Sequence, residues 1–188
     1  DLVLDACACP GGKSFGMAMA MKNQGKIFAR DLHKNKLSLI ETGAEKLGIS
    51  IIETGVQNAS VHNPEMPAFD KILCDVPCSG LGVIAKKPDI RYKNLSELKE
   101  LPKLQLAILK NQSRYVKAGG LLMYSTCTLV RAENEDVVEN FLKDNEDFYL
   151  EPLPLPARFP ENSSGMLALV PGEYDTDGFF ICRLRRKA

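Results

Sequence analysis

The sequence opens with "DLVLDACACPGGKSFGMAMA", residues 1–20, and this stretch decides the fold. Residues 1–6 are mostly apolar and predict a short strand, and residues 13–23, rich in Ala and Met, predict a helix after the turn Pro10-Gly11-Gly12. Glycines here let the backbone turn tightly and approach a ligand just ahead of a helix N-terminus. The pattern alone is typical of both a plain strand-to-helix turn and a ligand-binding turn.

The same alternation of strand and helix continues along the chain. Strands are predicted at residues 26–31, 49–53, 70–75, 121–126 and 178–184, and helices at residues 34–47, 102–118 and 133–143. Between them, residues 76–94 are expected to be irregular and the Pro-rich residues 152–160 to form a surface connection. Such alternation favours parallel strands joined by crossovers, with helices on both faces. The fold class is therefore predicted as α/β.

Length and composition narrow the functional classes. A chain of 188 residues that is 45% hydrophobic can bury a full core as one domain. The formal net charge is zero, so no global field draws the chain to nucleic acid or an acidic membrane. No apolar run is long enough to cross a bilayer and no signal segment opens the chain, which predicts a cytoplasmic protein without a membrane partner. Because the chain starts at Asp1, directly before an apolar run, we expect residues 1–188 to be a fragment without its N-terminal module.

The six cysteines are expected to be free thiols, because a core of this size needs no disulfide framework. One alternative is a zinc site built from Cys7-x-Cys9 and Cys74-x-x-x-Cys78. Neither the spacing nor the neighbouring residues favour it, and no metal site is predicted.

Polar side chains follow several of the predicted strands, where ligands bind in parallel sheets. Asp31 ends the second strand, where an acid can bind the ribose hydroxyls of a nucleoside cofactor or simply cap the next helix. Asp75 and Cys78 lie in "CDVPCSG", residues 74–80, and Cys127 lies in "YSTCT", residues 124–128. Asp75 could transfer protons or bond nearby backbone amides. Pro77 fixes the backbone ahead of Cys78, while Cys127 could be an inert buried thiol.

Five motifs together resemble a known family. They are "LDACACPGGKS" (4–14), "CDVPCSGLGV" (74–83), "KKPDIRY" (86–92), "LLMYSTCTLVRAENE" (121–135) and "DGFFICRLRR" (177–186). The chain resembles the RNA cytosine-C5 methyltransferases of the Nol1/Nop2/Sun family, most closely the bacterial Sun (Fmu) branch that modifies small-subunit ribosomal RNA. The resemblance implies S-adenosylmethionine as methyl donor and an upstream RNA-binding region. It also implies a Rossmann-like, mostly parallel seven-stranded sheet with an antiparallel last strand.

The resemblance also implies roles for particular residues. Cys127 would attack carbon 6 of cytosine, Asp75 would hold or protonate ring nitrogen 3, Lys13 would support the site electrostatically, and Cys78 would assist product release. The implied cofactor-binding residues are Cys7, Ala8, Cys9, Pro10, Gly11, Gly12, Lys13, Asp31, Asn58 and Asp75. Cys9 stands where the family usually has Ala, and Asn58 stands where an Asp more often bonds the adenine amino group.

Local charge predicts where RNA would bind. Basic residues cluster beside the proposed site at Lys86, Lys87, Arg91 and Lys93, and a second cluster at Arg183, Arg185, Arg186 and Lys187 is a weaker candidate. The partner is expected to be ribosomal RNA and the protein a monomer. Two other functions are considered: a nicotinamide-dependent oxidoreductase, which lacks its Gly-x-Gly-x-x-Gly fingerprint here, and a non-catalytic RNA-binding factor.

Overall fold

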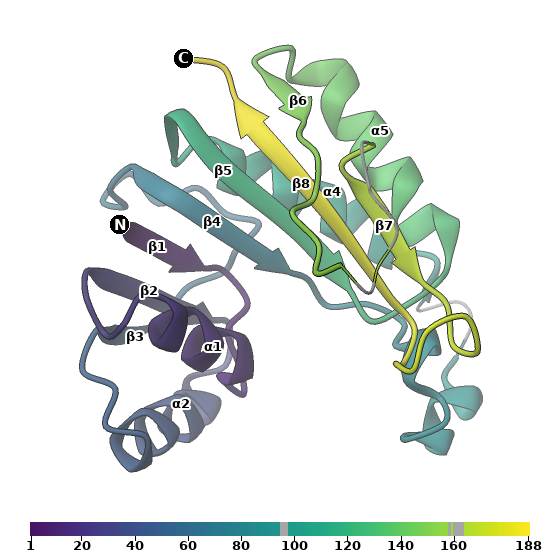
Figure 1. Ribbon diagram of the computed structural model, residues 1–188, viewed down its shortest axis with the longest axis horizontal. Helices are drawn as coiled ribbons and strands as arrows, with labels where there is room; N and C mark the ends of the chain where they lie inside the picture. The colour runs from purple at the N-terminus through teal and green to yellow at the C-terminus, as the bar shows by residue number, and fades with distance from the viewer. Residues whose placement is uncertain (95–97, 158, 160–163) are drawn as a thin grey trace.

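The structure is a computed structural model and describes residues 1–94, 98–157, 159 and 164–188. One sheet runs through the described part of the chain (Figure 1), in the order β3-β2-β1-β4-β5-β8-β6, with β7 pairing β8. Its strands are β1 (Leu2–Asp5), β2 (Lys26–Asp31), β3 (Ile52–Val56), β4 (Phe69–Asp75), β5 (Val116–Thr126), β6 (Phe148–Leu150), β7 (Met166–Leu169) and β8 (Phe179–Arg186).

Strand direction confirms a mostly parallel sheet with an antiparallel last strand. β1 to β5 pair in parallel, and β8 runs antiparallel to β5. The edge of β8 away from β5 is shared by two short strands, because β7 pairs with residues 179–182 and β6 with residues 184–186. The sheet is therefore seven strands wide, with two strands in the seventh position. Strands of three and four residues carry too little periodicity for the sequence to predict them.

Helices cover both faces of the sheet, as predicted. They are α1 (Gly12–Ala20), α2 (Lys34–Lys46), α4 (Leu101–Ser113) and α5 (Glu135–Asp144), of which α1 lies in front of the sheet and α4 behind it in Figure 1. Neighbouring residues of β1 show the two faces. Val3 belongs to a cluster with Ala18 of α1, whereas Leu4 packs in the main core with Ile108 and Leu109 of α4.

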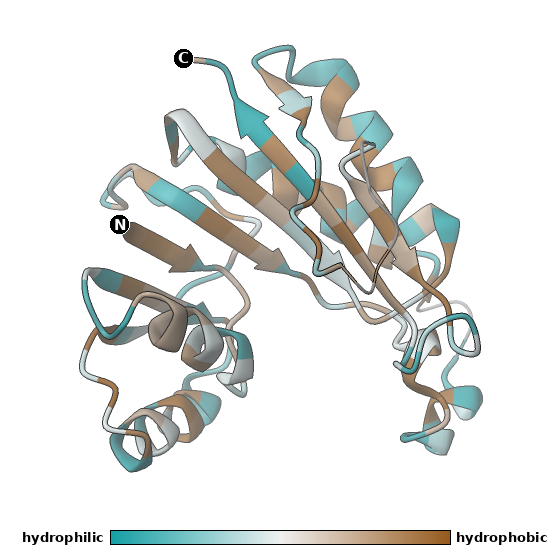
Figure 2. Ribbon diagram, viewed as in Figure 1, coloured by the Kyte–Doolittle hydropathy of each residue, from teal (hydrophilic) through white to brown (hydrophobic). Residues whose placement is uncertain are grey.

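The main core lies between the central strands and helices α4 and α5. Its largest fully buried side chains include Phe69, Leu122, Tyr124, Phe141 and Phe180. Figure 2 shows the corresponding apolar bands along β1, β4 and β5. This core fixes the carboxyl ends of β4 and β5, which carry Asp75 and lead into Cys127.

Within the described residues, no helix is long and apolar enough to cross a membrane.

Three predicted boundaries are corrected. The helix predicted at 102–118 ends at Ser113, because the chain enters β5 at Val116, which pairs with Phe69. Gly119, with a φ of +71°, bends β5 instead of ending the helix. The strand predicted at 49–53 lies at Ile52–Val56, and the helix predicted at 133–143 begins at Glu135.

A cleft lined by two thiols and a carboxylate

The turn after β1 is held against β2 by the backbone. The N–H of Ala8 donates to the carbonyl of Arg30 at 2.8 Å, and the N–H of Cys9 donates to Oδ2 of Asp31 at 3.2 Å. Gly11 then starts α1 with a φ of +112°, and a Cβ there would lie 2.6 Å from the ring of Phe15. Only glycine fits this backbone without strain. The turn predicted from the sequence is therefore present and rigid.

A cleft of about 630 Å³ opens at the carboxyl ends of the parallel strands, within the 300–1,000 Å³ typical of small-molecule sites. Eight predicted site residues line it: Cys7, Cys9, Pro10, Asp31, Asn58, Asp75, Cys78 and Cys127. Ala8 is buried behind the turn, and neither Gly11 nor Gly12 lines the cleft. Lys13 does not line the cleft itself, but its Nζ pairs with Asp75, which does. Sequence reasoning did not single out His33, Lys36 or Gln57, which also line it.

Asp31 is hydrogen-bonded to the turn after β1. Besides accepting the Cys9 N–H, it accepts the N–H of His33 through Oδ1 at 3.0 Å. The N-cap residue of α2 is His33, so the alternative of Asp31 as the N-cap is wrong. Asn58 is exposed at the cleft, and its Oδ1 accepts both the N–H and the hydroxyl of Ser60, at 3.0 and 2.8 Å. The oxygen expected to meet an adenine amino group is thus already engaged.

Asp75, the last residue of β4, connects three elements. Its Oδ2 lies 2.6 Å from Nζ of Lys13 at the start of α1, and its Oδ1 accepts the hydroxyl of Ser125 in β5 at 2.7 Å. Both partners of the Asp75 carboxylate are side chains. Within the described residues, the carboxylate does not accept a hydrogen bond from a nearby backbone amide, which was the alternative considered for Asp75. The carboxylate is held by a cation and a hydroxyl at the edge of the cleft.

The two thiols lie in contact across the cleft floor. Sγ of Cys78 is 3.2 Å from Sγ of Cys127, and the N–H of Cys127 donates to Sγ of Cys78 at 3.3 Å. Both residues are partly exposed, which distinguishes them from the fully buried Cys74 and Cys182. The inert, buried alternative for Cys127 is therefore wrong. The zinc alternative has no support either, because no metal-binding group of three or more His, Cys, Asp or Glu side chains occurs in the part of the chain that is described.

The hydrogen bond between the thiols separates their acidities. Donation from Cys78 lowers the pKa of Cys127 to about 7, against the effects of burial and of Asp75, and Lys13 assists. The same bond, together with burial, raises the pKa of Cys78 far above its usual value. The contact therefore favours the thiolate on Cys127 and the proton on Cys78. Burial raises the pKa of Cys7 to about 12 and of Cys9 to about 11, so Cys127 is the reactive thiol of the cleft.

The difference in pKa between the two thiols predicts how the alkylation of Cys127 depends on pH. Reaction of Cys127 with iodoacetamide should rise with pH to a midpoint near 7, because only the thiolate reacts. Cys78→Ala removes the donor and should move the midpoint upward by about one pH unit or more, since a hydrogen bond to a charged group is worth about 1.5–3 kcal/mol. Peptide mass spectrometry would follow Cys127 separately from the other thiols. An unchanged midpoint in Cys78→Ala would show that the thiol contact does not set the acidity of Cys127.

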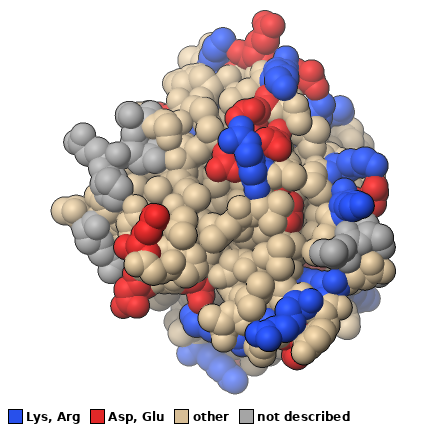
Figure 3. Space-filling view, turned by 90° about the vertical axis from the view of Figure 1, so that its right-hand side faces the viewer, with Lys and Arg blue, Asp and Glu red and all other residues tan. Residues whose placement is uncertain are grey.

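Only part of the predicted RNA-binding cluster is free. Nζ of Lys86 pairs with Asp177 at 2.6 Å, and Nζ of Lys93 donates to the carbonyl of Ser79 at 2.8 Å. Lys87 and Arg91 are exposed beside the 3₁₀ helix η2 (Pro88–Tyr92). Charges of both signs are scattered over the face drawn in Figure 3, in keeping with the zero net charge.

The C-terminal basic residues serve the fold. Arg183 and Arg185 both pair with Glu151, and Arg186 pairs with Asp147. These ion pairs join β8 to the residues directly before and directly after β6. We therefore retain only the first cluster as a candidate RNA contact.

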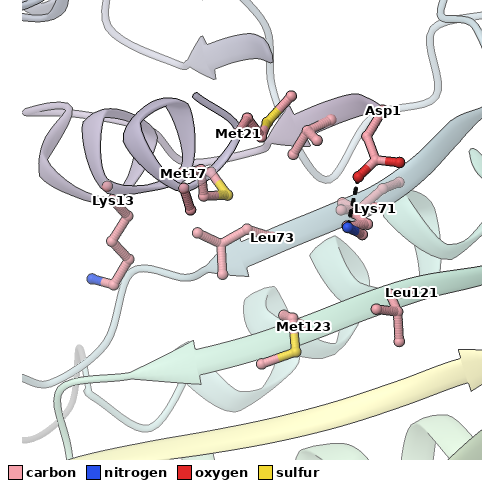
Figure 4. A pocket seen from close by; sticks show the side chains of 12 residues that line it. Asp1, Lys13, Met17, Met21, Lys71, Leu73, Leu121 and Met123 are labelled. Atoms are coloured by element: carbon pink, nitrogen blue, oxygen red, sulfur yellow. Dashed lines mark hydrogen bonds and ion pairs between the residues drawn. The ribbon is translucent and has the colours of Figure 1, made fainter. Parts of the chain in front are cut away.

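A second hollow, of about 480 Å³, lies beside α1 on the opposite side of β1 from the main core (Figure 4). Met17, Met21, Leu73, Leu121 and Met123 line it, and an ion pair of 2.6 Å joins Asp1 to Lys71 at its rim. Apart from Lys13 it contains no predicted site residue, and its lining is largely apolar. It therefore differs from the thiol-lined cleft, where eight of the predicted site residues gather.

Sequence reasoning missed the residues that hold the thiols in place. Gly82 donates its N–H to the carbonyl of Cys127 at 3.0 Å, and a Cβ there would lie 2.1 Å from the carbonyl oxygen of Gly178. Glu133 belongs to a short 3₁₀ helix, η3 (Arg131–Glu133), and is only 2% exposed. The acidic run "AENE" (132–135) was interpreted as the first turn of a helix, so nothing in the sequence marked Glu133 as buried.

Solved structures define the class of this protein. The chain is 31% identical to NSun6 from Pyrococcus horikoshii, solved with SFG, with a TM-score of 0.88 over 100% of this chain and 48% of that one. A SAM-dependent O-methyltransferase from Thermotoga maritima shares the fold at 16% identity and a TM-score of 0.58. The chain thus has the Rossmann-like fold of SAM-dependent methyltransferases.

Sequence comparison defines the family. The model of the family described as "16S rRNA methyltransferase RsmB/F" matches residues 1–185, and the chain belongs to this family. It is 45% identical to the probable ribosomal RNA small subunit methyltransferase B of Bacillus subtilis (strain 168), over 100% of this chain and 43% of that protein. It is 36% identical to the ribosomal RNA small subunit methyltransferase F of Escherichia coli O157:H7, over 98% and 40%. The resemblance to the Sun branch is confirmed, and the chain spans less than half the length of these relatives.

Proposed function

We propose that residues 1–188 form the catalytic domain of an enzyme that transfers a methyl group from S-adenosylmethionine to carbon 5 of a cytosine in small-subunit ribosomal RNA. One observation carries the proposal: two cysteine side chains and an aspartate meet at one cleft, with Sγ of Cys127 and Sγ of Cys78 3.2 Å apart. Family membership gives the reaction class, and the cleft contains the groups that this reaction needs.

The proposed chemistry uses both thiols. Carbon 5 of cytosine is a poor nucleophile, and addition of the Cys127 thiolate to carbon 6 makes it nucleophilic. Asp75 holds or protonates ring nitrogen 3, so that charge does not build up on the base. The bound S-adenosylmethionine supplies an electrophilic methyl group. Cys78, once it has passed its own proton to solvent, then accepts the carbon-5 proton. The electrons of that C–H bond form the carbon 5–carbon 6 double bond as the bond from Cys127 to carbon 6 breaks, so that the Cys127 thiolate is restored and nitrogen 3 returns any proton it received.

The cleft suits S-adenosylmethionine. Its volume of about 630 Å³ accommodates a nucleoside cofactor, and Asp31 lines it at the end of β2, the second strand along the chain. Cys9 stands where the family usually has Ala, and a small residue is expected to be tolerated there. The backbone N–H of Cys9 still donates to Asp31, so the contact between the turn and β2 is present. Lys13 and Asp75 pair at the edge between the cofactor turn and the thiols.

Asp31→Ala should weaken S-adenosylmethionine binding by about 1.5–3 kcal/mol, the value of a lost hydrogen bond to a charged group. Calorimetry on the purified chain would measure the affinity. Glu53→Ala is the matched control, since Glu53 is a carboxylate on neighbouring β3 that pairs with Arg30 and Lys26 and does not line the cleft. Equal affinities for Asp31→Ala and the unaltered chain would remove Asp31 from the cofactor site.

Substrate recognition is proposed to need more than these residues. The chain has zero net charge, and two of its four candidate RNA contacts are engaged within the protein. Its relatives are more than twice as long, which supports an additional RNA-binding module in the whole protein. Lys87 and Arg91 are then proposed to contact RNA close to the cleft. A monomer and a cytoplasmic location stay predictions.

Bisulfite mapping of ribosomal RNA from cells lacking the gene tests the function. We expect one 5-methylcytosine of the small subunit to disappear and to return when the unaltered gene is restored. A gene encoding Cys127→Ala should not restore it. Restoration by Cys127→Ala would instead support the non-catalytic RNA-binding alternative.

A further inference from the structure

We propose that Glu133 and Gln105 are positioning residues that clamp the peptide on both sides of Cys78 and so hold its thiol against Cys127. The proposal rests on the proposed function of the two thiols, but the geometry that supports it is independent of RNA. It concerns buried polar residues that line neither the cleft nor any predicted site.

The clamp consists of three hydrogen bonds. Oε2 of Glu133 accepts the N–H of Ser79 at 2.9 Å, directly after Cys78. Nε2 of Gln105 donates to the carbonyl of Pro77 at 2.9 Å, directly before Cys78, and also to Oε2 of Glu133 at 2.9 Å. Both neighbours of Cys78 are therefore fixed by one pair of side chains, and the thiol between them lines the cleft.

Glu133 is itself fixed to the strand that leads to Cys127. The hydroxyl of Tyr124 in β5 donates to the carbonyl of Glu133 at 2.6 Å, and Tyr124 is fully buried. The backbone of Glu133 is thus tied three residues ahead of Cys127, while its carboxylate is tied one residue after Cys78. This one residue sets the position of one thiol-bearing loop relative to the other.

A second layer of bonds joins the same loops. The hydroxyl of Ser79 donates to Oγ1 of Thr128 at 2.8 Å, and Nδ2 of Asn134 donates to the carbonyl of Thr128 at 2.9 Å. Oγ1 of Thr126 donates to Oδ1 of Asn134 at 2.7 Å. Ser79, Thr126, Thr128 and Asn134 are all buried. A network of this kind holds a geometry tightly only while every member keeps its partner.

Burying the polar side chains of Glu133 and Gln105 costs free energy of folding. This cost argues that the two residues serve the thiol site and not stability alone. Glu133 is 2% exposed, and carboxylates are rarely buried without a paired cation. Gln105 is fully buried, and its Oε1 has no hydrogen-bond partner among the described residues, because its amide is turned so that both donations reach the Cys78 loop and Glu133. An apolar pair would fill the same space without these costs, but it could not hold the peptides around Cys78.

The acidity of Cys127 is the readout, because it depends on the contact with Cys78 and needs neither RNA nor cofactor. Lys13 and Asp75 also face Cys127, and none of the variants alters them. Glu133→Leu removes the acceptor and should raise the pH midpoint of Cys127 alkylation by about one pH unit, as Cys78→Ala does. Glu133→Gln keeps an oxygen in place of Oε2 for both bonds and should keep a midpoint near that of the unaltered chain.

Phe141→Leu is the control for stability, since Phe141 is fully buried in α5 and takes no part in the network. It should lower the melting temperature and leave the midpoint unchanged. Gln105→Met keeps the side-chain volume, removes both donations, and should shift the midpoint in the same direction as Glu133→Leu. If Glu133→Leu does not fold, the midpoint of Cys127 alkylation in Gln105→Met tests the proposal.

The proposal is overturned if the variants that fold lose stability while the midpoint stays at its original pH. That result would leave Glu133 and Gln105 with a structural role only. Because the measurement involves no methyl transfer, it would leave the proposed function untouched. A failure of methyl transfer in the unaltered protein would conversely leave the clamp intact.

Discussion

Cys127→Ala should abolish turnover without forming a covalent complex with RNA, whereas Cys78→Ala should abolish turnover and accumulate such a complex. Cys127 carries the thiolate, because its pKa is lowered to about 7, and it would therefore form the bond to carbon 6. Cys78 carries the proton and sits 3.2 Å away, where it can act only after attack. Without Cys78 the base is attached and methylated but not released.

The two variants would look alike in a turnover assay, so the trapped species is the measurement. It would appear as a denaturant-resistant shifted band with the full-length protein and its RNA. The incubation should run at pH 8.5 or above, because Cys78→Ala is expected to raise the pKa of Cys127 and would otherwise slow the attack itself. A band from Cys127→Ala and none from Cys78→Ala would reverse the two roles.

The sequence predicted the sheet and the location of the site because both depend on local patterns. Apolar runs and glycine turns placed β1, β2 and β4 correctly, and in a parallel sheet the ends of these strands must share one edge. That rule alone brought Asp31, Asp75 and Cys127 together. The short strands β6 and β7 were missed because they are defined by pairing with β8 and not by their own periodicity.

What the sequence could not give is the set of contacts between distant residues. Nothing local places the Cys78 thiol in hydrogen-bond contact with Cys127, 49 residues further along. Lys86 and Lys93 were indistinguishable from Lys87 in sequence, yet two of the three are held within the protein. The sequence places Glu133 only at the start of the predicted helix 133–143, because its buried partners Ser79 and Gln105 lie far away in the chain.

Asp75→Asn should lower kcat by about 10²–10⁴, the usual contribution of a positioned acid or base. The amide keeps the shape of the side chain but cannot exchange a proton with ring nitrogen 3. The fold should survive, since the pair with Lys13 is solvent-accessible, with side chains 49% and 29% exposed, and such pairs add little stability. Ser125→Ala is the matched control, because it removes one donor to Asp75 and leaves the carboxylate, and should have a much smaller effect.

The step at which Asp75 acts can be read from the trapped complex. If Asp75 neutralises the ring while Cys127 adds, the double variant Asp75→Asn with Cys78→Ala should lose the band that Cys78→Ala alone produces. Calorimetry on the same protein would show whether S-adenosylmethionine still binds, since Asp75 also lines the cleft that is proposed to bind the cofactor. A double variant that binds cofactor and traps RNA as fast as Cys78→Ala would place Asp75 outside the attack, leaving the Lys13 pair as its only role in the site.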